Sequence, residues 1–191
     1  EQWDGSSWTE TADLNTARTG LGSVGTTTAS LASGGVTTTQ VAVNESWNGS
    51  AWTEVGDLNT ARGLLGSMGT STAGLVAGGG PAAAVSNAGV TESWNGSAWT
   101  EVNDLNQGGD TIGSAGTQTS NLVAGGASGP PANVNQVSTS FEYDGSSWTA
   151  GGALNTARFA GGGFGASNTA AVIAGGSRSP GSASGGETET Y

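Results

Sequence analysis

Short apolar runs alternate with turn-forming residues along the whole chain, and the same succession recurs four times. Each unit starts with a segment of small residues, continues with a short apolar run closed by two glycines, and ends with two short stretches that flank a turn. In the second unit the first two segments are 66–69 and 75–79, and the turn lies within 94–99. Helical periodicity is missing, so the pattern predicts four antiparallel strands per unit.

The most regular element is a tight turn between two aromatic residues, as in Trp47-Asn48-Gly49-Ser50-Ala51-Trp52. Asn48 and Gly49 tolerate the positive φ that a two-stranded hairpin needs, and the two tryptophans can face each other across the strands. The four copies of this hairpin are 3–8, 47–52, 94–99 and 143–148.

The repeat length indicates the architecture. The closing tryptophans of the hairpins, Trp8, Trp52, Trp99 and Trp148, follow one another at spacings of 44, 47 and 49 residues. Such a period is typical of propeller blades, which are built from four antiparallel strands. We therefore expect an all-β fold, a β-propeller with four blades of four strands, and a single domain that spans 1–191.

The positions of the repeated residues resemble the kelch repeat. A Gly-Gly pair after an apolar strand (Gly78-Gly79) is followed by two aromatic residues (Trp94 and Trp99) and by Leu105, with Arg62 or Arg158 in the other copies. The likeness covers nearly all of the chain. The amino-acid sequence of the repeats is also similar to that of kelch-like repeats in aquatic bacteriophages. It implies a propeller with the small-residue strand innermost, in a virion or outside the cell. The third copy departs from the pattern, because it has no arginine.

The two ends of the chain predict how the ring closes. Residues 187–191 match 90–94, so the last blade lacks its outer strand, and the N-terminus offers an unpaired one at 7–10. Pairing these segments would close the ring and remove two exposed edges. The competing interpretation is four repeats taken from a longer array.

Insertions are confined to one place in the repeat. The linker from the second glycine of each pair to a glutamate before the hairpin (Glu45, Glu92, Glu142 and Glu189) spans 10, 13, 16 and 13 residues. Variable segments are loops, and we expect them on one face, where they could bind a partner. The candidate binding loops are 35–44, 80–90, 127–140 and 177–186.

Composition limits the function. The chain has 15 acidic residues, 4 arginines, and neither lysine, histidine nor cysteine, for a net charge of -11. A protein that binds nucleic acid or an anionic membrane needs clustered cationic side chains, so neither is an expected partner. No apolar run is long enough to span a membrane, so no membrane insertion is expected either. The 36 glycines fall at fixed places in the repeats, which indicates backbone geometry rather than disorder.

The arginines and asparagines of the repeats are candidate polar sites: Arg18, Arg62, Arg158, Asn15, Asn59 and Asn155. The arginines could line a channel and bind an anionic ligand. We favour the alternative that they bond carboxylates or carbonyls between blades, because a charge near a core needs a partner. The expected carboxylate partners are Asp13, Asp57, Glu10 and Glu54.

The tryptophans Trp8, Trp52, Trp99 and Trp148 are candidate ligand-binding residues, as stacking platforms for a sugar. The stronger interpretation is that they pack on the outer layer of the blades. The turn carboxylates Asp4 and Asp144 offer too few oxygens for calcium, so neither a metal nor another cofactor is expected. Asn44, Asn48 and Asn95 fit the glycosylation pattern, but the Asn-Gly pairs are better explained by turn chemistry.

Without histidine, cysteine or lysine, the chain offers poor catalytic chemistry, and its acidic residues stand at repeat-equivalent positions. We therefore predict that the protein is not an enzyme. We expect a structural or adhesive binding module of a virion or cell-surface assembly, and an extracellular or virion-associated location. Its partners would be proteins or surface glycans, and it could be a homo-oligomer within the assembly. The alternatives are a glycan-binding lectin with repeated tryptophan pockets and a fragment of a larger kelch-type propeller.

Overall fold

The strands occur along the chain in the order that the sequence repeats predict. In this computed structural model we describe residues 1–80, 89–106, 109, 112–128, 135–178 and 186–191. Every regular element in these ranges is a β-strand. Within the same ranges, no helix has the length and apolar character needed to cross a membrane.

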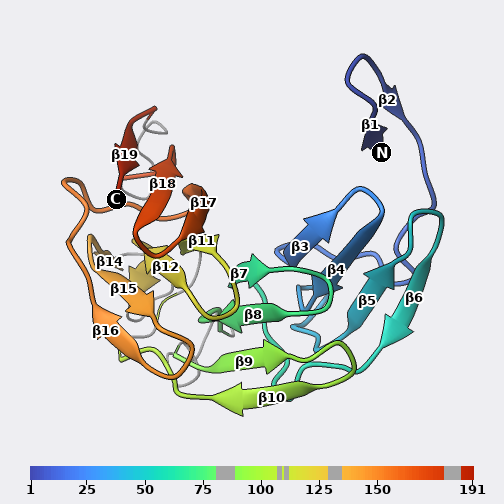
Figure 1. Ribbon diagram of the computed structural model, residues 1–191, viewed down its shortest axis with the longest axis horizontal. Helices are drawn as coiled ribbons and strands as arrows, with labels where there is room; N and C mark the ends of the chain where they lie inside the picture. Colours follow the sequence, from blue (N-terminus) through green and yellow to red (C-terminus); the bar gives the residue numbers. More distant parts are fainter. Residues whose placement is uncertain (81–88, 107–108, 110–111, 129–134, 179–185) are drawn as a thin grey trace.

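The strands form four blades, arranged as a β-propeller (Figure 1). Blade 1 contains β3 (Gly22–Thr26), β4 (Ala29–Ser33), β5 (Asn44–Trp47) and β6 (Trp52–Val55). Blade 2 contains β7 (Gly66–Gly69), β8 (Gly74–Ala77), β9 (Thr91–Trp94) and β10 (Trp99–Val102). Blade 3 contains β11 (Gly113–Gly116), β12 (Asn121–Ala124), β15 (Ser140–Tyr143) and β16 (Trp148–Ala150), and blade 4 contains β17 (Gly162–Ser167), β18 (Ala170–Ala174) and β19 (Thr188–Thr190). Two short ribbons are added, β1 (Gln2–Trp3) with β2 (Trp8–Thr9) and β13 (Ala127–Ser128) with β14 (Asn135–Gln136). The all-β propeller is therefore confirmed.

The small-residue strands β3, β7, β11 and β17 are the innermost, where neighbouring blades touch. A Cβ atom on Gly22 would lie 2.3 Å from Cδ1 of Leu65 and 3.0 Å from Cβ of Ser67, so a larger residue would require these side chains to move. Serines join these strands: Ser67 Oγ accepts from Ser23 N at 3.1 Å and donates to Ser23 O at 3.1 Å. Ser114 Oγ likewise accepts from Ser67 N at 3.1 Å and donates to Ser67 O at 3.2 Å. Small residues recur here because the inner strands approach so closely.

The hairpins owe their shape to local chemistry. Asn48 Oδ1 accepts hydrogen bonds from Ser50 N at 2.9 Å and Ala51 N at 3.0 Å, and Gly49 has a φ of 96°. This arrangement favours glycine at the second turn position. Trp47 and Trp52 face each other with their ring centroids 5.3 Å apart. The other three aromatic pairs have the same tilted geometry.

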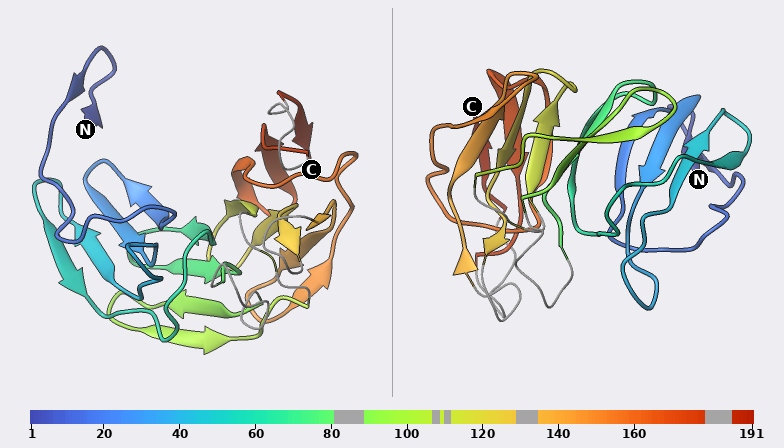
Figure 2. Two further views of the ribbon diagram at one scale, coloured as in Figure 1. Left: turned by 180° about the vertical axis from the view of Figure 1, so that it is seen from behind. Right: turned by 90° about the horizontal axis from the view of Figure 1, so that it is seen from below.

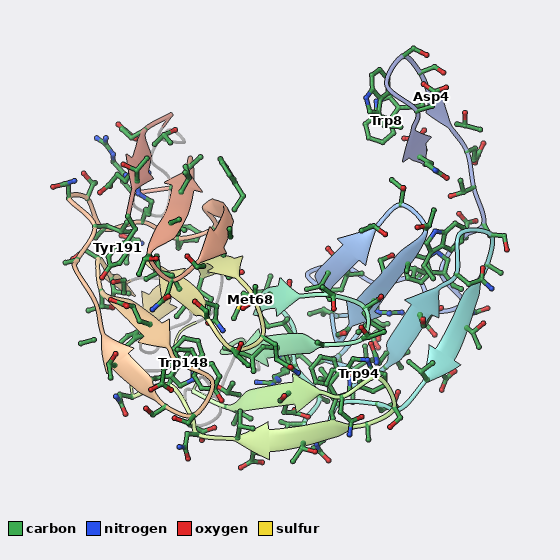
Figure 3. The ribbon with its side chains drawn as sticks, viewed as in Figure 1. Asp4, Trp8, Met68, Trp94, Trp148 and Tyr191 are labelled. Carbon is green, nitrogen blue, oxygen red and sulfur yellow. The ribbon has the colours of Figure 1, made fainter. Side chains whose placement is uncertain are left out.

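Three apolar cores hold the blades together, one at each internal blade interface. Their buried members are Leu31, Leu58, Leu65, Val76, Trp94 and Trp99 between blades 1 and 2; Met68, Leu75, Ala77, Leu105, Val123, Tyr143 and Trp148 between blades 2 and 3; and Ala115, Leu122, Ala124, Ala171 and Ile173 between blades 3 and 4. In the first two, aliphatic side chains of one blade meet the hairpin aromatics of the next. Figure 3 places Trp94, Met68 and Trp148 among the blades.

The prediction that the N-terminal strand pairs with the last blade is wrong. Within the described ranges, β2 pairs only with β1 and β19 only with β18. The β1–β2 hairpin and β17–β19 lie at opposite ends of an open arc (Figures 1 and 2). The turn at 4–7 joins β1 to β2 directly, so their pairing costs little chain entropy, whereas ring closure would join segments nearly a whole chain apart. Trp3 and Trp8 add a ring contact at 5.5 Å.

Candidate functional site

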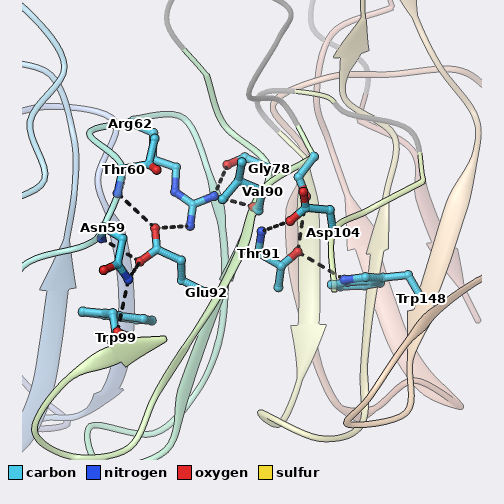
Figure 4. Close-up of polar contacts among 11 residues, drawn as sticks. Asn59, Thr60, Arg62, Gly78, Val90, Thr91, Glu92, Trp99, Asp104 and Trp148 are labelled. Atoms are coloured by element: carbon cyan, nitrogen blue, oxygen red, sulfur yellow. Dashed lines mark hydrogen bonds and ion pairs between the residues drawn. The ribbon is translucent and has the colours of Figure 1, made fainter. Parts of the chain in front are cut away.

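The segment that connects one blade to the next is bonded to a buried glutamate. Between blades 1 and 2, Glu92 on β9 accepts bonds from Asn59 N and Asn59 Nδ2, both at 2.8 Å, and from Arg62 Nη2 at 3.0 Å (Figure 4). Arg62 Nη1 donates to Gly78 O at 3.1 Å and also to Val90 O. Both charged side chains are fully buried. The connection is therefore bonded to blade 2 by a polar network, which we call the arginine–glutamate bridge and in which only Nε of the Arg62 guanidinium has no partner.

The same bridge is present twice more. Arg18 pairs with Glu45, and Arg158 pairs with Glu189 at 2.6 Å. Asn15 N and Asn155 N each donate to the glutamate of their bridge at 2.7 Å.

The three arginines thus match the structural interpretation rather than a ligand-binding channel. Their carboxylate partners are Glu45, Glu92 and Glu189, so the expected partners Asp13, Asp57, Glu10 and Glu54 were wrong. Two aspartates of the connections have another role, since Asp57 accepts from Asn44 N at 3.2 Å and Asp104 from Thr91 N at 3.1 Å.

Two of the bridge glutamates, Glu45 and Glu189, have a pKa below the usual range. Burial raises the pKa of Glu45, but hydrogen bonds from the Arg18 side chain and from the N–H groups of Asn15 and Thr16 outweigh it, so the pKa lies below its usual range. Burial also raises the pKa of Glu189, and the Asn155 bonds with the Arg158 charge bring it below its usual range.

Blade 3 has an apolar pair where the others have the bridge. Phe141 faces Val123 as Glu92 faces Val76, so Phe141 occupies the glutamate position. Gly109 occupies the arginine position, because its carbonyl accepts from Gly79 N at 3.0 Å. Gly35 N makes the same bond to the carbonyl of Arg62, at 2.9 Å. Both members of the ion pair are therefore replaced together.

Glu142 is consequently not the equivalent of the other three glutamates, which corrects the alignment of the linkers. It stands one residue before the hairpin aromatic, whereas Glu92 stands two residues before Trp94. It accepts instead from Tyr191 OH at 2.6 Å and from Asn168 Nδ2 at 2.9 Å. This offset of one residue is the sequence signal that distinguishes the bridge glutamates from Glu142.

The four candidate tryptophans lie in two kinds of environment. Trp99 and Trp148 are buried, with 6% and 5% of their surface exposed, so neither offers a free ring face to a sugar. Trp52 is half-buried, and Trp8 is 66% exposed. Equivalent pockets in every repeat are therefore not formed, and only Trp8 and Trp52 are accessible to a ligand.

Trp8 and Trp52 lie in one cleft of about 790 Å³ between the β1–β2 hairpin and blade 1, which we call the N-terminal cleft. Its walls carry aromatic and small polar side chains: Trp3, Trp8, Trp47, Trp52, Asp13, Asn15, Arg18, Thr26, Thr27 and Ser30. Figure 3 shows Trp8 on the hairpin that stands apart from the blades. The cleft thus brings together four of the predicted site residues, whereas Trp3 and Trp47 were not among them. Sequence reasoning missed those two because every hairpin carries the same aromatic pair.

Two further acidic groups, Asp4 and Asp144, accept hydrogen bonds within the hairpin turns. Asp4 Oδ1 accepts from Ser7 N and Ser6 N, both at 2.8 Å, and these bonds lower the pKa of Asp4 to about 2. The bonds from Ser147 and Ser146 lower the pKa of Asp144 to about 2 as well. Within the part of the chain that the structure describes, no three potential ligands gather to hold a metal ion. The cleft therefore provides stacking and hydrogen-bonding groups.

The predicted binding loops are described only in part. The first, 35–44, is described throughout, and Val41 N bonds Gly35 O within it at 3.0 Å. The third starts with β13, which pairs with β14 at Asn135–Gln136. The segments 81–88, 129–134 and 179–185 of the other three loops lie outside the described residues.

The fold and the bridges define a β-propeller whose blades are joined by polar connections and whose accessible aromatic cleft lies at one end. No protein-family model matches the chain, and a search of curated proteins finds no significant match either.

Proposed function

We propose that this protein is a non-enzymatic kelch-like β-propeller, which serves as a structural or adhesive module of a virion or a cell-surface assembly. In this proposal it binds a protein partner through the apolar surfaces at the two ends of its arc. The variable loops provide a second contact surface for the same partner.

A single observation carries the proposal. Trp3 and Trp8 at one end are 46% and 66% exposed, and Phe164 at the other end is 59% exposed. The equivalent Trp94 and Trp99 inside the molecule are 2% and 6% exposed. Large aromatic side chains at a surface favour contact with another macromolecule, because their burial removes much apolar area from water.

Several charged groups of the repeats are engaged in structural bonds. The three repeat arginines are bonded in the bridges, and the pKa of about 2 keeps Asp4 and Asp144 ionised and unsuited to proton transfer near neutral pH. These features favour a binding module over an enzyme.

Site-specific cross-linking tests the proposal. Trp8 is replaced by the photoreactive residue benzoylphenylalanine in the organism that encodes the chain, and mass spectrometry identifies what it links to. We expect a covalent link to another polypeptide. The matched control places the same residue at Thr100, which is exposed on the outer strand of blade 2. A yield at Trp8 no higher than at Thr100 would contradict the proposal.

A glycan ligand is the second candidate, and the composition of the N-terminal cleft favours it. Trp8 and Trp52 offer stacking faces, and Asn15, Thr26 and Ser30 offer amide and hydroxyl groups, as sugar sites require. On a glycan array, Trp8→Ala and Trp52→Ala should each abolish binding while circular dichroism shows an intact fold. Binding that survives both substitutions, or no binding by the unmodified chain, would exclude this candidate.

A further inference from the structure

The internal blade interfaces repeat one apolar contact, which gives the molecule two complementary faces. The outgoing face of each blade carries one residue of its first strand opposite one residue of its second. These pairs are Val24 with Leu31, Met68 with Leu75, and Ala115 with Leu122. They belong to the three apolar cores, in which they meet the next blade.

Blade 4 presents the same outgoing face, and no further blade in the described part of the chain covers it. Phe164 pairs with Val172 as Met68 pairs with Leu75. Phe164 is 59% exposed, whereas Met68 is 2% exposed. Val172 is half-buried, whereas Leu75 is fully buried.

Blade 1 presents the matching incoming face inside the N-terminal cleft. At the interface between blades 1 and 2, the incoming side chains are Leu58, Leu65, Trp94 and Trp99, all buried. Their equivalents at blade 1 are Leu14, Leu21, Trp47 and Trp52, of which only Trp47 is buried. The two ends of the arc therefore carry the two halves of a contact that the molecule itself makes between blades 1 and 2 and between blades 2 and 3.

The strands at the two ends are also incomplete in a complementary way. Blade 4 ends with β19 as an edge, while β1 and β2 form a hairpin without inner strands, within the described part of the chain. Because these elements lie at opposite ends of the arc (Figures 1 and 2), one copy does not bring its own two faces together.

We propose that the occupant of the N-terminal cleft is a second copy of this chain. Its blade 4 enters between the β1–β2 hairpin and blade 1, so that its Phe164 and Val172 pack on Leu14, Trp47 and Trp52. The hairpin then lies beside the free edge of β19. This inference rests on the proposed binding function and names its partner. A contact between two different faces repeats head to tail, so it builds a larger ring or a filament.

Charge gives the association a distinctive salt dependence. Each copy carries a net charge of -11, so two copies repel each other at low ionic strength. Added salt screens this repulsion and leaves the apolar contact in place. Self-association should therefore strengthen with salt, whereas binding driven by opposite charges would weaken.

Analytical ultracentrifugation of the full chain tests the proposal. We expect the mass to rise with protein concentration and with salt, in steps of one chain. Phe164→Glu should weaken association by about tenfold or more, because it places a charge in the apolar contact. Thr100→Glu is the matched control, since it adds the same charge at an exposed position, and it should leave association unchanged.

A mixing experiment distinguishes head-to-tail contact from a symmetric dimer. Phe164→Glu blocks the outgoing face, and Leu14→Glu blocks the incoming face. Each variant alone should stay monomeric, and their mixture should form a one-to-one dimer through the two intact faces. Circular dichroism checks that both variants are folded.

Three results would overturn the second copy as partner: a monomer at all concentrations and salt conditions, an oligomer insensitive to Phe164→Glu, or no dimer in the mixture. Cross-linking of position 8 to a different polypeptide would then preserve the proposed binding function. Absence of any cross-link would remove both.

Discussion

The connections into blades 2 and 3 solve the same structural problem with opposite chemistry. Into blade 2, Arg62 and Glu92 form a buried ion pair with Asn59 and two carbonyls as further partners. Into blade 3, Gly109 and Phe141 stand at the same two positions, and Phe141 packs against the neighbouring apolar core. A cavity of only about 10 Å³ lies beside them.

The backbone is the same in both cases. Gly35 N donates to the carbonyl of Arg62 at 2.9 Å, and Gly79 N donates to the carbonyl of Gly109 at 3.0 Å. The leucine of each connection is held by a backbone bond as well, from Leu58 N to Ala42 O at 3.0 Å and from Leu105 N to Gly89 O at 2.8 Å. The course of the connection is therefore set by backbone bonds. The ion pair is one of two ways to fill the space, which agrees with the general finding that apolar packing can replace a buried ion pair.

Removal of one charge from the bridge should have the largest effect. Arg62→Ala leaves Glu92 buried without its cation and removes the arginine donor to Gly78 O, while Val90 O keeps its bond from Gly78 N. We therefore expect a loss of about 3–5 kcal/mol in the free energy of unfolding. Urea denaturation measures it. Arg178→Ala is the control, because the pair of Arg178 with Glu187 is about half exposed and should contribute about 0–1 kcal/mol. Equal losses in the two variants would show that the buried bridge has no special role.

A charge introduced at blade 3 should be nearly as harmful. Phe141→Glu places a carboxylate where no arginine stands, and we expect a loss of about 2–4 kcal/mol. Gly109→Arg in the same chain should recover at least about 1 kcal/mol of it, since the new bridge gives the carboxylate a partner. A Cβ atom on Gly109 would lie 3.4 Å from Ala127 O, an ordinary contact, so the backbone there accepts a Cβ atom. A double-mutant cycle with no coupling would contradict the equivalence of the two positions.

Acid should weaken the bridges and not the apolar connection. The pKa of Glu45 and of Glu189 is lower in the folded protein than the ordinary value of 4.5, so the unfolded chain binds more protons below that pH. Their contribution is complete above pH 4.5 and is lost as the pH falls through the lower folded value. Urea denaturation between about pH 7 and pH 3 should show this decline. Glu189→Gln should make it shallower, and an unchanged pH profile would contradict the assignment.

Replacement of the whole bridge by apolar residues should have the smallest effect. We expect Arg62→Met combined with Glu92→Leu to change the free energy of unfolding by about 1 kcal/mol or less, because no unpaired charge remains. Thermal and urea denaturation beside Arg62→Ala measure the difference. If the double variant is as unstable as Arg62→Ala, blade 2 depends on the ion pair in a way that blade 3 does not.

Much of the fold was predictable because it depends on local chemistry. The Asn48-Gly49 turn and its three counterparts fix the hairpins, and the repeat length indicates propeller blades. The small residues of the inner strands could also be predicted from the sequence. Gly22 and Ser67 each have counterparts in other repeats, at positions where the inner strands converge.

The candidate site was less predictable. The bridge glutamates could have been found from their distance to the hairpin aromatic, which is two residues for Glu92 and one for Glu142. The accessibility of Trp8 could not be found in this way, because its hairpin has the same turn sequence, Asp-Gly-Ser-Ser-Trp, as the one that buries Trp148. The burial of the hairpin tryptophan depends on a neighbouring blade, and the residues of the hairpin do not determine whether that blade is present.

The sequence by itself determined the strands, the turns and the number of blades, because each is specified within a few residues or by the period of the repeat. Only the tertiary structure decided that β1 pairs with β2 rather than with blade 4, and that Trp8 and Phe164 stay exposed at the two ends. Those outcomes depend on contacts between distant segments, whose chain-entropy cost the local pattern does not encode.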